Sequence, residues 1–159
     1  MHCHVSRLLS LFVVACVSLG AAARLAADQP SKADAGKPQD VTFDDIKFEM
    51  KKGDPFLRSM LTDKIEKLDG SRIRIRGYML PSFQQKGITQ FVLVRDNMEC
   101  CFGPGAALYD CILIEMDKGQ STSFTVRPVA VTGKFEVSEF KGPDGKHLAI
   151  YRMSGEAVN

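Results

Sequence analysis

Three cysteines stand close together in a stretch that could carry thiol or metal chemistry. Cys100 and Cys101 are adjacent and Cys111 follows, all within residues 95–111, between two strongly apolar segments. Thiolates bind zinc and copper, and thiols in an oxidising compartment form disulfides. Connections in small β domains are usually about 2–5 residues long, and residues 95–111 form a longer one. We call this segment the cysteine loop and expect it to be a functional element.

The residue types in the cysteine loop are compatible with three kinds of chemistry. In a disulfide interpretation, Cys100 or Cys101 bonds to Cys111 and fixes the loop. In a metal interpretation, the three thiolates bind zinc or copper, and His147 or Asp110 completes a tetrahedral site. In a redox interpretation, Cys100 and Cys101 form a strained adjacent disulfide that is easily reduced.

A second candidate site is a run of arginines that alternate with isoleucines. Arg72, Arg74 and Arg76 are separated by Ile73 and Ile75. In a β-strand, successive side chains point to opposite faces, so the three guanidinium groups would share one face. Such a face could bind a polyanion, and the same alternation is typical of the solvated side of a half-buried strand.

The sequence contains no complete catalytic constellation. It has no nucleophile motif, no glycine-rich phosphate loop with its lysine, and no paired His-Glu-His zinc signature. The 21 lysines and arginines nearly balance the 19 aspartates and glutamates, so no strong overall field draws the protein to nucleic acid. We therefore expect a binding or accessory protein rather than an enzyme, whose partner is an envelope protein or a small ligand.

The N-terminus has the layout of a secretory signal. A short cationic start, residues 1–7, precedes an apolar run over residues 8–15 and a small-residue segment over residues 19–23. The run is shorter than the roughly 20 apolar residues that a transmembrane helix needs, so no membrane span is expected. Alternatively, Cys16 ends a lipoprotein box and becomes the acylated N-terminus of a lipid-anchored protein.

We expect residues 1–23 to be a signal peptide and residues 24–42 to be a flexible tether. The tether is rich in Ala, Asp, Lys, Pro and Gln and has hardly any large apolar residue. It therefore cannot bury enough surface to offset the entropy of ordering. These features place the protein outside the cytoplasm, in the periplasm or cell envelope, with a single domain over residues 43–159.

Periodicity in that domain predicts one short helix followed by strands. Asp54 and Pro55 form a helix-start signal, and Asp69 with Gly70 ends the helix. Between these signals, apolar residues repeat at helical spacing: Leu57, Leu61, Ile65 and Leu68. The strands are expected over residues 72–80, 90–96, 111–116, 126–137 and 148–153.

Two of the expected strands resemble each other. Residues 73–79 and 129–135 both place β-branched residues at period two before a glycine within the strand, Gly77 and Gly133. A glycine there permits a bulge or sharp coil, which lets one strand serve two faces of a small closed sheet. We therefore expect an OB-fold-like, five-stranded antiparallel barrel, with a small β-sandwich as the alternative.

Short motifs give the sequence a resemblance to a known family. Residues 68–70 (LDG), 77–81 (GYMLP), 90–94 (QFVLV) and 100–103 (CCFG) occur in an order that resembles DUF3299, an exported bacterial family of unknown function. The resemblance covers roughly residues 43–153. It implies an OB-type barrel that is secreted or lipid-anchored, sometimes alongside envelope transport components, without an established reaction.

The resemblance also supports Cys100 and Cys101 as the pair of interest. Many relatives follow these cysteines with a proline-rich stretch and an asparagine, whereas residues 105–110 here read GAALYD. A ligand pocket shaped by those positions would therefore differ in this chain.

We expect an exported cell-envelope binding or accessory module whose cysteine loop binds a metal or is locked by a disulfide. Two alternatives stay open. One is a thiol-dependent redox or metal-transfer protein that acts through Cys100 or Cys101. The other is a polyanion-binding barrel that uses the arginine face.

Overall fold

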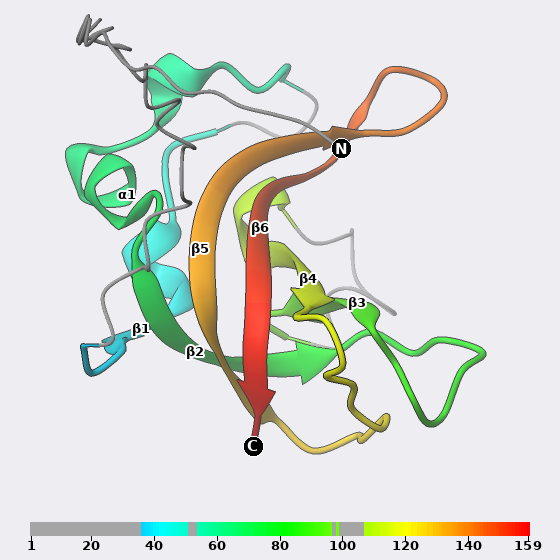
Figure 1. Ribbon diagram of the computed structural model, residues 1–159. Helices are drawn as coiled ribbons and strands as arrows, with labels where there is room; N and C mark the ends of the chain where they lie inside the picture. Colours follow the sequence, from blue (N-terminus) through cyan, green and yellow to red (C-terminus); the bar gives the residue numbers. More distant parts are fainter. Residues whose placement is uncertain (1–35, 51–53, 97, 99–106) are drawn as a thin grey trace, which may run out of the picture. The chain divides into compact units, whose positions relative to one another are not determined.

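The computed structural model describes residues 36–50, 54–96, 98 and 107–159, and in this part the protein is mainly β with little helix (Figure 1). The expected signal peptide, the possible lipidation site Cys16 and most of the expected tether lie outside the described residues. Six strands form one sheet: β1 (Gln39–Val41), β2 (Arg72–Met79), β3 (Gln90–Val94), β4 (Cys111–Met116), β5 (Val129–Lys141) and β6 (His147–Val158). Among the described residues, the delimited helices are α1 (Asp63–Leu68) and the 3₁₀ turns η1 (Phe43–Ile46), η2 (Arg58–Met60) and η3 (Leu108–Asp110). Within the described residues, no helix is long and apolar enough to cross a membrane.

The strands pair in an order that returns to its start. β2 pairs with β3, β3 with β4, β4 with β6, β6 with β5, and β5 pairs back with β2. The sheet is mixed, because β4 and β6 are parallel and β1 is parallel to β2. The expectation of a wholly antiparallel sheet was wrong at these two pairs. A parallel pair needs a long crossover connection, and here β5 with its flanking loops supplies the one between β4 and β6.

β1 is an ordered element in a segment that we expected to belong to the tether. Gln39 pairs with Ile73 and Val41 pairs with Ile75, so β1 extends the sheet beside the first half of β2. Val41 is buried. A strand of three residues with one apolar side chain is too short to give a period-two pattern. The polar composition around it therefore led to the prediction of a flexible tether.

The helix is shorter than predicted and begins later. It was expected to start at Asp54, but α1 begins at Asp63, where the Thr62 hydroxyl accepts a hydrogen bond from the Ile65 main-chain nitrogen at 3.4 Å. Leu57, the first apolar residue of the expected helical face, is exposed, whereas Phe56 is buried. Burial of Phe56 takes the chain away from helical spacing, so the cap at Thr62 sets the start instead.

The two glycines singled out in the sequence both lie at close main-chain approaches. The similar segments run antiparallel to each other, with Ile73 opposite Gly133 and Gly77 opposite Val129. A side chain at Gly77 would place its Cβ 2.6 Å from the carbonyl oxygen of Val94. At Gly133, where the register with β6 shifts, a Cβ would collide with the carbonyl of Ser154. The predicted bulge at Gly133 is confirmed.

A buried hydrogen bond joins β6 to η1. Tyr151 on β6 is fully buried, and its hydroxyl donates a hydrogen bond of 2.7 Å to the carbonyl oxygen of Ile46 in η1. Burial raises the pKa of Tyr151 above its ordinary value, so the hydroxyl stays protonated and remains a donor. This bond ties η1 to the far end of the chain.

Replacement of Gly133 by alanine should destabilise the domain, because the main-chain oxygen of Ser154 cannot move away without disturbing the β5–β6 pairing. Overpacking typically costs about 1–3 kcal/mol, and chemical denaturation should show at least that loss in the free energy of unfolding. Gly36→Ala is the matched control, since nothing lies within 4 Å of a Cβ added there. Equal stability of the two variants would contradict the close approach.

The Tyr151→Phe variant should lose about 1–3 kcal/mol of unfolding free energy, because the Ile46 carbonyl is left buried without its donor. Thermal or chemical unfolding measures the loss. Tyr78→Phe serves as the control, because the half-buried Tyr78 has no hydrogen bond from its hydroxyl to the described residues. If both variants kept wild-type stability, the buried bond would not form in solution.

Candidate functional site

The cysteine loop leaves the sheet and returns to it at a single neck. Val94, the last residue of β3, pairs with Cys111, the first residue of β4, and the main-chain nitrogen of Arg95 donates to the carbonyl oxygen of Asp110 at 3.1 Å. Cys111 is half-buried. Cys100 and Cys101 lie outside the described residues, so the structure places one of the three predicted thiols.

Charged side chains fix this neck from outside. One guanidinium nitrogen of Arg95 lies 2.8 Å from a carboxylate oxygen of Asp44 in η1, and another lies 3.8 Å from a carboxylate oxygen of Asp110. Asp110 is buried. The residue predicted as a possible metal ligand is therefore held at the neck by an ion pair.

A row of aromatic contacts connects the neck of the cysteine loop with His147. The rings of Tyr109 and Phe48 have centroids 5.3 Å apart, those of Phe48 and Phe56 are 5.9 Å apart, and those of Phe56 and His147 are 5.6 Å apart. All three pairs have the edge-to-face geometry that aromatic quadrupoles favour. His147, which begins β6, is thus connected to Tyr109 in η3 through Phe48 and Phe56. These two residues lie in the segment between η1 and η2, which we call the irregular segment.

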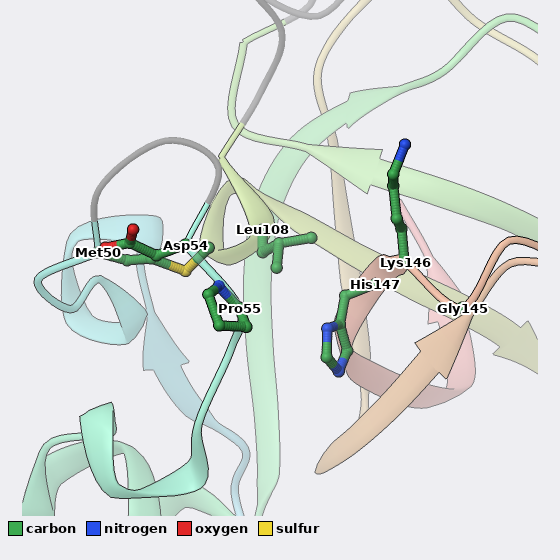
Figure 2. Close-up of a pocket in the computed structure, with 7 residues that line it drawn as sticks. All are labelled: Met50, Asp54, Pro55, Leu108, Gly145, Lys146 and His147. Carbon is green, nitrogen blue, oxygen red and sulfur yellow. The ribbon is translucent and has the colours of Figure 1, made fainter.

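His147, at the end of this row, also lines a hollow of about 470 Å³, which we call the His147 hollow. Its lining residues are Met50, Asp54, Pro55, Leu108, Gly145, Lys146 and His147. Figure 2 shows Pro55 and the ring of His147 on opposite sides of the hollow, with the Leu108 side chain above the gap in this view and the Lys146 side chain extending away from the ring. The volume falls within the range of about 300–1,000 Å³ found for small-molecule sites.

Glu139 forms ion pairs beside the hollow, on the β5–β6 hairpin. The Nε2 atom of His147 lies 2.8 Å from a carboxylate oxygen of Glu139, and the amino group of Lys141 lies 3.1 Å from the same oxygen. The hydrogen bond from His147, followed by that from Lys141, holds the pKa of Glu139 below its ordinary value. Glu139 is therefore an anion at neutral pH.

The part of the chain that the structure describes holds no group of three or more His, Cys, Asp or Glu side chains arranged to bind a metal. Asp110, Cys111 and His147 consequently do not make such a group by themselves. A metal site would need Cys100 or Cys101 as further ligands.

The three predicted arginines share the outward face of β2 but differ in their partners. Ile73 and Ile75 between them are fully buried. Arg72 donates three hydrogen bonds of 2.6–3.0 Å to Glu156 and one of 2.7 Å to the carbonyl oxygen of Gly36. Arg74 makes one long contact of 3.5 Å with Asp40. Arg76 has no hydrogen bond or ion pair with the residues that the structure describes.

Sequence reasoning missed most of the His147 hollow. Met50, Asp54 and Pro55 belong to an irregular segment, and Lys146 lies in a turn, so none of them falls in a periodic pattern. The weak signal was the pair of isolated phenylalanines, Phe48 and Phe56, in an otherwise polar stretch.

Sequence comparison decides the family. A family model described as "Protein of unknown function (DUF3299)" matches residues 27–159. The chain belongs to the DUF3299 family. The resemblance expected from the short motifs is thereby confirmed, and it begins earlier than residue 43.

A solved DUF3299 structure is similar in fold. The crystal structure of a DUF3299 family protein from Pseudomonas aeruginosa PAO1 matches with a TM-score of 0.56 and 18% sequence identity, over 78% of this chain and 96% of that chain. No curated protein matches the sequence. The DUF3299 relationship therefore identifies a fold and a family of unknown function.

Replacement of His147 by glutamine should raise the pKa of Glu139 towards its ordinary value of 4.5, because the variant removes the main contact that stabilises the carboxylate. A carboxyl carbon NMR titration measures the shift. A lowered pKa means that this contact stabilises the hairpin above the ordinary pKa and loses its effect as the pH falls through the lowered value.

Lys146→Gln is the control for this titration, because Lys146 pairs with Asp144 and not with Glu139. An unchanged Glu139 pKa in His147→Gln would mean that the His147–Glu139 contact is not populated in solution.

Proposed function

We propose that this DUF3299 protein is an exported binding module of the cell envelope, in which a small ligand binds in the His147 hollow. The hollow carries the proposal. Apolar walls from Met50, Pro55 and Leu108 surround a few polar groups, which is the composition typical of ligand sites. The walls come from three segments that are distant in the sequence, so the fold itself assembles them.

The proposed location rests on the N-terminal sequence. A cationic start, a short apolar run and small residues over residues 19–23 have the order of a secretory signal, with acylation of Cys16 as the alternative. Three cysteines remain after removal of residues 1–23, which suits an oxidising compartment or a metal site.

The proposed architecture is an OB-like barrel built from β2 to β6. Its support is the closed order of pairings, β2–β3–β4–β6–β5–β2, in which β4 and β6 are parallel. A five-stranded Greek-key barrel has this connectivity. The hollow lies where the irregular segment, η3 and the turn of the β5–β6 hairpin come together.

A thiol-dependent metal-binding or metal-transfer function is the second candidate, and the position of His147 favours it. Leu108 and His147 line the same hollow, and Leu108 lies three residues before Cys111. The imidazole is therefore on the side of the domain where the cysteine loop returns to the sheet. In this candidate, Cys100 and Cys101 would add thiolates to Cys111 or His147, and zinc or copper would be the metal.

Native and denaturing mass spectrometry of the mature protein, purified from the envelope in which it is made, tests these candidates. A ligand in the hollow should give a native mass excess that disappears on denaturation. Leu108→Lys should abolish the excess, because it places a charge on the wall, whereas Cys100→Ser with Cys101→Ser should leave it. Val126→Lys, at an exposed position outside the hollow, is the matched control.

The same experiment separates the second candidate. A mass excess equal to one metal ion, lost in the double serine variant and accompanied by three alkylatable thiols, would favour the metal site. A metal-free protein with one alkylatable thiol would assign the cysteines to a disulfide. Absence of any mass excess, together with an unaltered Leu108→Lys protein, would contradict ligand binding in the hollow.

A further inference from the structure

We infer a second binding site, for a phosphate-type oxyanion, in a hollow of about 530 Å³ beside Arg74 and Arg76. We call it the arginine hollow. Asp40 and Thr42 from the β1 region, Arg74 and Arg76 from β2, and Pro128 and Ala130 at the start of β5 contribute to its lining. This site is separate from the His147 hollow and shares no lining residue with it.

The strand register sets both guanidinium groups over small side chains. Arg74 lies opposite Asp40 on β1 and Thr132 on β5, and Arg76 lies opposite Ala130. Because cross-strand neighbours point to the same face, the β5 neighbours of the two arginines on that face are the small residues Thr132 and Ala130. These small residues leave open space between the long side chains.

The main chain beneath the arginine hollow is fixed. The main-chain nitrogen of Ala130 donates to a main-chain oxygen of Asn159 at 2.8 Å, and the main-chain nitrogen of Asn159 donates to the carbonyl oxygen of Ala130 at 3.0 Å. Ala130 is also paired with Arg76 in the β2–β5 ladder. A ligand there would meet a pre-ordered wall, so little entropy would be lost in ordering the site.

Unequal pairing of the arginines selects two of the three as ligand groups. Glu156 and the Gly36 carbonyl already engage Arg72. Arg74 has only the 3.5 Å contact with Asp40, whose side chain is 73% exposed, and Arg76 has no partner among the described residues. The unused donors therefore gather at the arginine hollow rather than along the whole strand.

This distribution argues for a compact anion rather than an extended polyanion. The basic face is interrupted, because Arg72 pairs with Glu156 and Lys134, opposite Arg72, pairs with Glu136 at 2.8 Å. Arg74 and Arg76, whose Cα atoms lie about 7 Å apart along the strand, can each donate to different oxygens of a tetrahedral anion. A carboxylate has only two oxygens and would be used up by one guanidinium fork.

Phosphate could reach the arginine hollow as the free ion or as the headgroup of a phospholipid. Calorimetric titration of the mature chain with inorganic phosphate measures the first. Co-sedimentation with phosphatidylglycerol vesicles, compared with neutral phosphatidylcholine vesicles, measures the second. Saturable binding in either assay is expected, and the assay in which it occurs identifies the source.

Arg76→Gln should weaken this binding about tenfold or more, because it removes charge-assisted hydrogen bonds. Arg76→Lys should recover only part of the loss, since an ammonium keeps the charge but not the fork. Asp40→Asn should tighten binding, because it removes the carboxylate that competes for Arg74. Lys118→Gln, which loses the same charge at an exposed position outside the hollow, should bind as the wild type does.

Thermal unfolding of Arg76→Gln should match the wild type, since the Arg76 side chain makes no hydrogen bond or ion pair with the described residues. The inference is overturned if neither phosphate source binds saturably at millimolar concentration. It is also overturned if Arg76→Gln and Lys118→Gln lose equal affinity, because binding would then report net charge alone. Neither result would bear on the His147 hollow, which has its own mass-spectrometric test.

Discussion

The close main-chain approach at Gly133 is the constraint on which the arrangement of the sheet depends. At this residue β5 is paired on one side with Ile73 of β2 and on the other with Gly155 of β6. A Cβ at Gly133 would collide with Ser154, and one at Gly155 would approach the sulfur of Met116 at 2.9 Å. The absence of side chains at both positions lets β5 serve two neighbours, so the strand pairings return to β2.

The length of β5 beyond this point builds the candidate site. After Gly133, β5 continues beside β6 to Lys141, with register shifts near Phe140 that alter the course of the hairpin. His147 lies at the end of this hairpin, where Phe56 contacts its ring. His147, at the end of the sheet, thus forms part of one wall of the His147 hollow. Aromatic packing connects it with the neck of the cysteine loop.

The two hollows differ in the way their charges are balanced. Beside His147, the anionic Glu139 is paired with His147 and Lys141, and Met50, Pro55 and Leu108 give the hollow apolar walls. Beside Arg76, two arginine side chains stand against one acidic side chain among the described residues, since Asp40 makes a single contact of 3.5 Å with Arg74. One environment suits a ligand with an apolar body, and the other suits an anion.

The sequence by itself determined the family, the mainly β character, the positions of β2 to β6 to within a few residues, the register shift at Gly133 and the outward arginines, but it missed β1. These features follow from period-two alternation and local steric limits, which are written in consecutive residues. Only the tertiary structure decided the parallel β4–β6 pair, the late start of α1 and the lining of the His147 hollow. It also decided which arginine keeps unused donors, because Glu156 lies far from Arg72 in the chain and their pairing depends on folding.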